Sequence, residues 1–294
     1  MNNKLRVLAP AKVNLYLRVL ARRPDGYHGL RTVFHTVGLW DEVRLASSRR
    51  FRFTATGLTV PAGGANLCVA AYRLLKDATG TTREASLHLV KRIPAGAGLG
   101  GGSADAAATL AGLNRLWDLR LGRGRLAALA ARLGSDVPFF LTGGAALGVG
   151  RGERLRPLAS RLSAWAVLLK PRFGVPTREA YRALDRSRRG TPPAGPGEGG
   201  ILSALRTGSL RGTIVHNDFT PVVAALHPKI RTLLGVLETA GAESSFLTGS
   251  GSAVVGLVRS PGVARRIARA LSARHRVAAY AVRLAPLRLR IETT

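Results

Sequence analysis

A glycine-rich run that leads directly into a helical pattern constrains this chain more than any other feature. In residues 94–108, PAGAGLGGGSADAAA, five of the six residues from Gly98 to Ser103 are Gly or Ser. Glycines let backbone amides approach an anion with no Cβ in the way, and a helix start adds free N–H groups and a positive dipole end. The run therefore predicts a phosphate cradle. The alternative is a flexible turn, which would not need this many glycines beside a helix.

Two well-known phosphate loops do not fit this run. It lacks the Gly-Lys-Ser/Thr ending of a Walker loop, and no acidic residue stands at the end of a following strand, as a dinucleotide fingerprint would require. Ser103 is expected either to cap the helix or to contact a phosphate or its Mg²⁺. Asp105 is expected to favour the dipole as an early helix residue, and no metal role is assigned to it.

Length and composition indicate an ordinary globular protein. The chain has 294 residues, of which 46% are apolar, enough for two modest domains or one large α/β domain. No apolar stretch approaches the roughly 20 residues of a membrane helix, and residues 1–12 lack the apolar core of a signal peptide. We therefore expect a cytoplasmic protein with no membrane attachment. The single cysteine, Cys68, excludes an internal disulfide and is expected to be a small buried apolar residue.

The formal net charge of +29 leaves two interpretations. Residues 1–150 carry 21 basic and 8 acidic side chains, and residues 151–294 carry 24 and 8, so the excess is spread evenly. Of the basic residues, 39 are Arg and 6 are Lys. We interpret this bias as a coding preference rather than a polyanion-binding surface, because no basic tail or stripe is present. A positive field would still attract an anionic substrate.

Apolar periodicity predicts an alternation of strands and helices. Strands are expected at 13–19, 42–46, 51–56, 86–91, 164–170, 253–258 and 277–283, and helices at 67–75, 106–117, 126–133, 228–240 and 261–274. Ser260 is expected to cap the last helix, and residues 185–200, rich in Pro, Gly and charge, are expected to form a surface loop. The pattern indicates an α+β protein. Its weakest junction lies at residues 157–163, which predicts domains at 1–160 and 161–294.

Three further segments accompany the glycine run. They are PAKVNL at residues 10–15 with DGYH at 25–28, GSDVPFF at 134–140, and LTGSGS at 247–252. With these motifs the chain resembles the GHMP small-molecule kinases nearly end to end. The combination of PAKVNL, DGYH and GSDVPFF is similar to the branch of that family that phosphorylates a cytidine-diphosphate-linked methylerythritol.

The resemblance implies both a fold and a reaction. The fold has an N-terminal nucleotide-binding domain and a C-terminal ferredoxin-like domain, with the site in the cleft between them. In the reaction, ATP would give its γ-phosphoryl group to the 2-hydroxyl of the cytidyl substrate, in non-mevalonate isoprenoid biosynthesis. ATP is thus the expected co-substrate, accompanied by Mg²⁺ whose ligands are left unassigned, as is the oligomeric state.

The resemblance also assigns a catalytic pair. Asp136 matches the family's catalytic aspartate and Lys12 its partner lysine. A carboxylate can accept the proton of a bound hydroxyl, and a neighbouring lysine can stabilise developing phosphoryl charge. The structural alternatives are a turn or helix cap at Asp136 and a solvated strand residue at Lys12.

The remaining site residues follow from the same resemblance. The expected ATP-binding residues are Pro94, Ala95, Gly96, Ala97, Gly98, Leu99, Gly100, Gly101, Gly102, Ser103 and Ala104, with Asn66 near the adenine. The expected substrate-binding residues are Asn14, which would bind the polyol, Tyr27, His28, Thr177 and Tyr181. The two tyrosines would stack on the cytosine while His28 reads its edge. Tyr181 stands where the family more often has Phe. The alternatives are purely structural roles: Asn14 at a strand edge, Tyr27 in the core and His28 at the surface.

Two other functions remain open at this point. A GHMP kinase acting on a different alcohol would share the glycine loop, but Tyr27, His28 and Tyr181 argue against it. A nucleic-acid-binding protein would suit the net charge, but it would leave the glycine loop and Asp136 unexplained, and the sequence has no aromatic-rich strand motif. Nucleic acid is therefore not expected as a partner.

Overall fold

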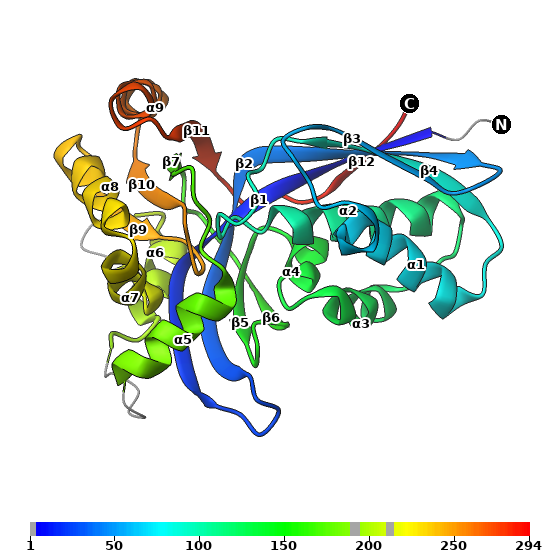
Figure 1. Cartoon of the computed structure of the whole chain (residues 1–294), viewed down its shortest axis with the longest axis horizontal. Helices are drawn as coiled ribbons and strands as arrows, with labels where there is room; N and C mark the ends of the chain where they lie inside the picture. The colour runs from blue at the N-terminus through cyan, green and yellow to red at the C-terminus, as the bar shows by residue number, and fades with distance from the viewer. Residues whose placement is uncertain (1–3, 189–194, 210–214) are drawn as a thin grey trace.

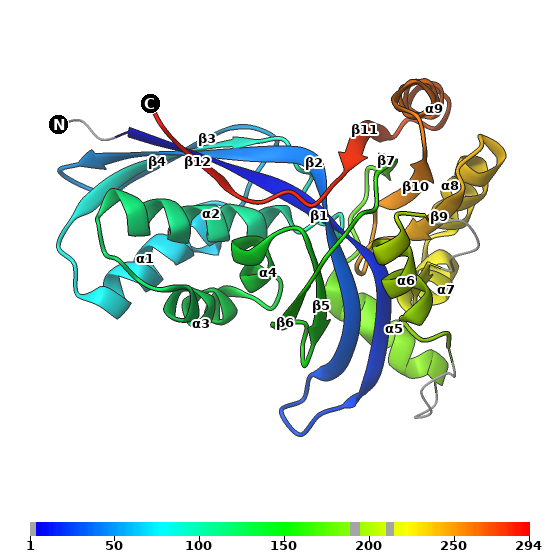
Figure 2. The same cartoon turned by 180° about the vertical axis from the view of Figure 1, so that it is seen from behind.

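The computed structural model describes residues 4–188, 195–209 and 215–294. Within these residues, one sheet of 12 strands runs through the molecule (Figure 1 and Figure 2). Its main path is β12-β1-β2-β11-β7-β10-β9, and β4 and β5 also pair with β2. None of the helices in these ranges is long and apolar enough to cross a membrane.

The N-terminal half is built on two long antiparallel strands, β1 (Lys4–Arg22) and β2 (His28–Ser48). The strands around them are β3 (Arg52–Gly57), β4 (Glu84–Lys91), β5 (Ala145–Val149), β6 (Arg154–Leu158) and β12 (Arg290–Thr293). The helices are η1 (Gly63–Ala65), α1 (Leu67–Thr79), α2 (Gly101–Leu116), α3 (Arg123–Leu133) and α4 (Val137–Thr142). Figure 1 shows α1 to α4 beneath one face of this part of the sheet.

Burial explains why the sequence pattern revealed only part of β1. The strand was expected at residues 13–19 but extends over 4–22, and every residue from Ala9 to Leu17 is buried. A strand covered on both faces loses the alternation of apolar and polar residues that marks a half-exposed strand. The central run also includes Pro10, Lys12 and Asn14, which break any apolar pattern.

The C-terminal half confirms the expected ferredoxin-like arrangement. It contains β7 (Ala164–Lys170), α5 (Thr177–Arg188), α6 (Gly199–Thr207), β8 (His216–Asn217), α7 (Phe219–Leu226), α8 (Pro228–Thr239), β9 (Ser244–Leu247), β10 (Val254–Val258), α9 (Pro261–His275) and β11 (Ala278–Leu284). The order β11-β7-β10-β9, antiparallel throughout, is that of two split βαβ units. The α+β class is therefore confirmed, and this topology is the one expected for the C-terminal domain.

Several local expectations need correction. Residues 185–188 belong to α5 and Gly199 begins α6, so the expected loop at 185–200 is shorter, and residues 189–194 lie outside the described ranges. Ser260 occupies the cap position of α9, but its side chain makes no capping hydrogen bond. The domain boundary at residue 160 falls between β6 and β7 and stays a prediction.

Candidate active site

The glycine run forms a tight loop between β4 and α2, and its conformation explains its composition. Gly98 and Gly100 have φ values of +74° and +71°, where L side chains are strained. A Cβ on Gly98 would lie 2.0 Å from the carbonyl oxygen of Thr248, and one on Gly100 would lie 2.7 Å from the Phe140 ring. Gly100 is also the N-cap residue of α2, so Ser103 lies inside the helix and does not cap it.

Both halves of the chain hold this loop. The Lys12 amide of β1 donates to the Leu99 carbonyl at 3.0 Å. From the C-terminal half, the amides of Ser252 and Ala253 donate to the Gly96 and Ala97 carbonyls at 3.3 and 3.1 Å. The loop is therefore fixed on both sides, as a backbone cradle for phosphate groups requires.

Lys12 and Asp136 meet beside the loop. The Lys12 ammonium lies 3.4 Å from the Asp136 carboxylate, and Lys12 is only 3% exposed. This burial contradicts the alternative of a solvated strand residue. Asp136 precedes α4, but its side chain makes no capping hydrogen bond, so the capping alternative is also wrong. The structure thus brings together the two residues expected to be catalytic.

Asn14 orients the lysine. Its Oδ1 accepts a hydrogen bond from Lys12 Nζ at 2.7 Å, and its Nδ2 donates to Thr32 Oγ1 at 2.8 Å. The backbone amide of Asn14 donates to Thr248 Oγ1 at 3.1 Å, which ties β1 to the LTGSGS segment. Asn14 is 2% exposed, so it is not a strand-edge residue. Its contact with Lys12 and the role of Thr248 were not foreseen.

A buried ionic cluster lies behind the loop. Lys91 Nζ contacts Asp41 at 2.5 Å and Asp105 at 2.6 Å, and Asp41 also accepts hydrogen bonds from the amides of Arg92 and Ile93. Burial raises the pKa of Asp105 well above its usual value; Lys91 opposes the rise and the Asp41 carboxylate adds to it. Burial alone would lower the pKa of Lys91, but the two carboxylates together raise it. The expected helix-dipole role of Asp105 is thus replaced by a structural one.

Two cavities adjoin at Asp136. The first, the glycine-loop cavity, has a volume of about 420 Å³ and is lined by the loop, Lys12, Asn14 and the segment from Thr59 to Leu67. The second, the α5 cavity, has a volume of about 830 Å³ and is lined by Tyr27, His28 and one face of α5. The residues that line both cavities are Leu30, Ser103, Asp136, Thr177 and Tyr181.

The aromatic residues of the α5 cavity differ in exposure. Tyr27 is 58% exposed, so it is not a core residue. His28 stacks on Tyr181 with ring centroids 5.2 Å apart. The His28 side chain is largely buried; its Nδ1 contacts the Leu20 carbonyl and its Nε2 contacts Asp185, both at 3.1 Å. Burial, with smaller contributions from Asp136 and Asp185, raises the pKa of Tyr181.

Sequence reasoning missed Asp185. It lies four residues after Tyr181 on α5, a spacing that places both side chains on one helix face. That spacing was a usable signal once Tyr181 had been singled out. The motif comparison overlooked it because Asp185 fell inside the stretch expected to be a loop.

Thr177 and Asn66, two further residues expected in the site, each line a cavity and also hold a neighbouring segment in place. Thr177 shares a 3.0 Å hydrogen bond with Ser250, which links the start of α5 to the LTGSGS segment. Asn66 Oδ1 accepts from the Cys68 amide to cap α1, and its Nδ2 donates to the Pro61 carbonyl. Asn66 thus lines the glycine-loop cavity while shaping the segment before α1. Cys68 is buried, as expected, and burial raises the pKa of its thiol.

The described residues contain no group of three or more His, Cys, Asp and Glu side chains that could hold a metal ion. A kinase can do without such a protein cage, because Mg²⁺ is commonly held by one or two carboxylates together with the phosphates of the nucleotide. Ser103 and Asp136 are oxygen-bearing side chains that face both cavities.

Comparisons with known proteins agree with this geometry. The model of the GHMP kinases N terminal domain matches residues 66–144, and that of the GHMP kinases C terminal domain matches residues 201–277. The 4-diphosphocytidyl-2-C-methyl-D-erythritol kinase of Moorella thermoacetica is 44% identical over 90% of this chain and 93% of its own length. That of Kineococcus radiotolerans is 43% identical over 88% of this chain and 83% of its own length.

A solved structure gives the same result. The crystal structure of a 4-(cytidine 5'-diphospho)-2C-methyl-D-erythritol kinase superposes with a TM-score of 0.82 at 38% identity, covering 95% of this chain and 99% of the other. Sequence, motifs and fold thus agree over almost the whole length. The chain belongs to the GHMP kinases and, within them, to the 4-diphosphocytidyl-2-C-methyl-D-erythritol kinase family.

Proposed function

We propose that this protein transfers the γ-phosphoryl group of ATP to the 2-hydroxyl of 4-diphosphocytidyl-2-C-methyl-D-erythritol, in non-mevalonate isoprenoid biosynthesis. One observation carries the proposal beyond the family name. Asp136, paired with Lys12, lies in the wall shared by a cavity built on a glycine loop and a cavity that carries two tyrosines. A phosphoryl donor in the first cavity and an acceptor in the second would meet at this pair.

The residues suit an in-line transfer between the cavities. Asp136 would take the proton of the acceptor hydroxyl, and the resulting oxygen would attack the γ-phosphorus while ADP leaves. Lys12, oriented by Asn14, would compensate the charge that develops on the transferred group. The lysine is already in place and largely out of water, so little reorganisation is needed as the charge develops.

The glycine loop supplies the phosphate site. The free amides at the start of α2 and the loop amides would contact the ATP phosphates, because no Cβ shields the backbone at Gly98, Gly100 or Gly101. The segment from Thr59 to Asn66, which lines the same cavity, would enclose the adenine. Mg²⁺ would accompany ATP and neutralise its phosphates when bound. Because ATP is a cytoplasmic co-substrate, we expect the reaction to take place there.

On the acceptor side, Tyr27 and Tyr181 would hold the pyrimidine and His28 would read its edge. Thr177 and Asn14 would border the polyol between this end and Asp136. We also expect the division into domains at 1–160 and 161–294 to separate the parts that carry the two ends of the substrate, since Tyr27 and Tyr181 come from different halves.

ADP formation is the direct test of this function. The purified protein should release ADP with the cytidyl methylerythritol substrate and not with homoserine or mevalonate. Turnover of either control alcohol at a comparable rate would point to a different GHMP kinase. A nucleic-acid function would instead require binding to heparin or RNA that persists at high salt, with no ADP release.

A further inference from the structure

Four arginines line the α5 cavity, and they are not equivalent. Arg22 Nε donates to the Gly26 carbonyl at 3.1 Å, and the Arg151 guanidinium lies 5.0 Å from the centre of the Tyr27 ring. Both are thus engaged with the hairpin that carries Tyr27. Arg178 and Arg182, on α5, form no hydrogen bond or ion pair with any residue in the described parts of the chain. Two cationic groups therefore face this cavity without a partner among the described residues.

The acidic residues of the cavity do not supply that partner. Asp136 pairs with Lys12 at 3.4 Å, and Asp185 contacts His28 at 3.1 Å. The chain has 39 arginines and only 16 acidic residues, so an unpaired arginine is in itself no sign of function. What distinguishes Arg178 and Arg182 is their place in the wall of the cavity that also holds the catalytic carboxylate.

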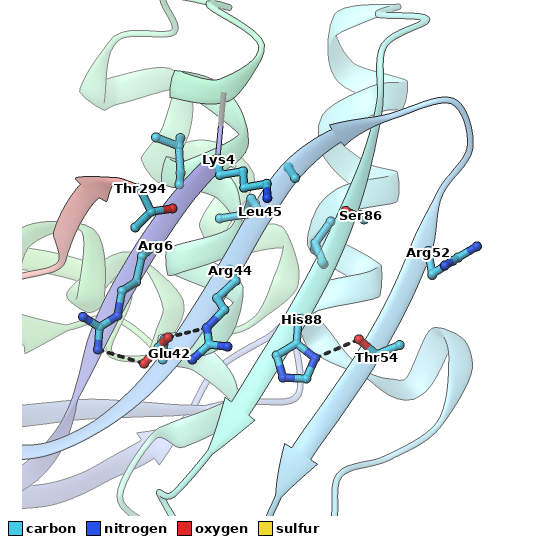
Figure 3. A pocket seen from close by; sticks show the side chains of 13 residues that line it. Lys4, Arg6, Glu42, Arg44, Leu45, Arg52, Thr54, Ser86, His88 and Thr294 are labelled. Atoms are coloured by element: carbon cyan, nitrogen blue, oxygen red, sulfur yellow. Dashed lines mark hydrogen bonds and ion pairs between the residues drawn. The ribbon is translucent and has the colours of Figure 1, made fainter. Parts of the chain in front are cut away.

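In a second hollow, two of the lining arginines are paired with a carboxylate of the protein. This hollow, of about 640 Å³, lies on the outer face of the N-terminal sheet (Figure 3). There Glu42, 1% exposed, contacts Arg6 at 3.0 Å and Arg44 at 2.6 Å. One buried carboxylate thus pairs with two guanidinium groups within the protein. The α5 cavity contains no such carboxylate for Arg178 and Arg182.

The spacing of these arginines suits one anionic ligand. Residues four apart on a helix lie on the same face, about 6 Å apart along its axis. Tyr181 lies between them in sequence, and it also faces the cavity. An anion bound by both arginines would therefore lie beside the ring of Tyr181, on the path toward Asp136.

We propose that Arg178 and Arg182 form a clamp for the diphosphate of the acceptor substrate. This inference rests on the proposed function, in which the pyrimidine lies against Tyr181 and the reacting hydroxyl lies at Asp136. The diphosphate joins those two ends, so it must cross the wall that carries the two arginines. The planar guanidinium group offers paired donors that match phosphate oxygens. They would also offset the repulsion between the diphosphate and the carboxylates of Asp136 and Asp185.

Calorimetric titration with cytidine and with CDP tests the clamp, because the two ligands differ only in the phosphates. The wild-type protein should bind CDP more tightly than cytidine. Arg178→Ala and Arg182→Ala should each weaken CDP binding about 5- to 10-fold, the range for losing a charge-assisted hydrogen bond, and leave cytidine binding unchanged. Arg178→Lys and Arg182→Lys should fall between, since they keep the charge and lose the paired donors.

Arg186→Ala is the matched control. Arg186 lies one turn further on the same face of α5 but does not line the cavity, so its removal changes the net charge equally. It should keep the wild-type ratio of the cytidine and CDP dissociation constants. Binding of a non-hydrolysable ATP analogue should also stay unchanged in all variants, because that ligand occupies the glycine-loop cavity.

The outcomes separate the clamp from the function on which it rests. If the variants keep the wild-type ratio of cytidine to CDP affinity, or if Arg186→Ala raises it equally, the clamp is refuted while the kinase assignment stands. If the wild-type protein binds neither cytidine nor CDP, the proposed function fails and the clamp fails with it.

Discussion

The two cavities that meet at Asp136 are built in opposite ways. The glycine-loop cavity is made of backbone amides, buried side chains and loop hydrogen bonds contributed by both halves of the chain. The α5 cavity is made of long side chains, including the 58% exposed Tyr27 and several arginines. In the proposed function, the first cavity presents fixed N–H groups to ATP, a ligand common to many kinases. The other presents side chains that can vary without disturbing the fold.

The difference explains where recognition from sequence succeeds. A backbone cradle demands glycine at particular positions, because Gly98 and Gly100 have φ values that other residues rarely adopt. Such a site therefore leaves a dense local motif. A site of exposed side chains needs only a few residues placed by the fold, so Arg178, Arg182 and Asp185 leave little trace in the sequence.

Asp136→Asn should have the largest effect, because Asp136 belongs to both cavities. We expect turnover to fall by about 10²–10⁴, the range for loss of a general base. Binding of ATP and of the cytidyl substrate should persist, since the amide keeps the shape of the carboxylate. Steady-state rates together with titrations of both ligands measure this. A turnover near that of the wild type would show that Asp136 is not the general base.

Gly100→Ala tests the backbone cavity alone. A Cβ there would lie 2.7 Å from Phe140 and 3.0 Å from Lys12, at a φ of +71°. We expect ATP-analogue affinity to fall by about 5- to 150-fold, through strain and overpacking of about 1–3 kcal/mol, while CDP affinity changes little. Gly124→Ala is the control, because a Cβ at that position of α3 meets no atom within 4 Å.

Circular dichroism and thermal unfolding show whether Gly100→Ala still folds. A folded Gly100→Ala protein with wild-type affinity for the ATP analogue would show that the loop is not the phosphate site. Equal losses of ATP-analogue and CDP affinity would show that the two cavities are not separate in the way described above.

The sequence alone predicted some elements of the fold correctly and missed others. Local patterns were sufficient for β7, expected and found at 164–170, because an apolar run with a clear start and end needs no tertiary context. They were insufficient for α5, whose first residues belong to the matched motif but whose end lies in a Pro-, Gly- and Arg-rich stretch.

Long-range partners could not be predicted at all. Lys91 is 50 residues from Asp41 and 14 from Asp105, and no periodicity relates these distances to contact in space. Thr248 lies 234 residues from Asn14, yet the two share a hydrogen bond. Lys12 and Asp136 were predicted to act together only because the residues match a family motif, whereas their spacing in the sequence gave no reason to join them.

The α5 cavity should bind and discriminate bases through two contacts with different roles. Tyr181→Ala should weaken CDP and UDP binding about equally, by about 1–3 kcal/mol, because both pyrimidines present a similar π-face. His28→Ala should weaken CDP more and narrow the CDP-over-UDP preference. The Leu20 carbonyl can only accept, so Nδ1 of His28 carries a proton in this arrangement. In a neutral ring Nε2 then accepts, which suits the amino group of cytosine.

Competition by CDP and UDP against the substrate measures both variants. Asp185→Asn adds a third variant to this test. Asp185 contacts His28 Nε2 at 3.1 Å, so its side chain must move away if that nitrogen is to bind the base. The Asp185→Asn variant should have a different ratio of CDP affinity to UDP affinity from the wild type, and the same affinity for the ATP analogue. If Tyr181→Ala abolishes the preference for CDP over UDP and His28→Ala leaves that preference unchanged, then Tyr181 rather than His28 recognises the base.

The smallest effect is expected behind the glycine loop, where Asp105 should make stability depend on pH. Its folded-state pKa is raised, chiefly by burial, above the ordinary value of 3.8. The folded protein therefore holds a proton that the unfolded chain has lost, so this group's contribution to stability is complete below about pH 4 and falls as the pH rises toward the folded-state value. Asp105→Asn has no proton to lose, so its stability should lack this decline.

Urea unfolding of the wild type and of Asp105→Asn at pH 5 and pH 8 measures the effect. The difference in unfolding free energy should move in favour of the variant as pH rises, by at most about 1.4 kcal/mol per pH unit. Asp77→Asn, at an exposed position of α1, should show no such trend. Parallel curves for Asp105→Asn and the wild type would show that Asp105 is ionised in the fold. The cluster with Lys91 and Asp41 would then hold two charged carboxylates behind the loop, and the backbone cavity would owe its rigidity to a full ionic triad.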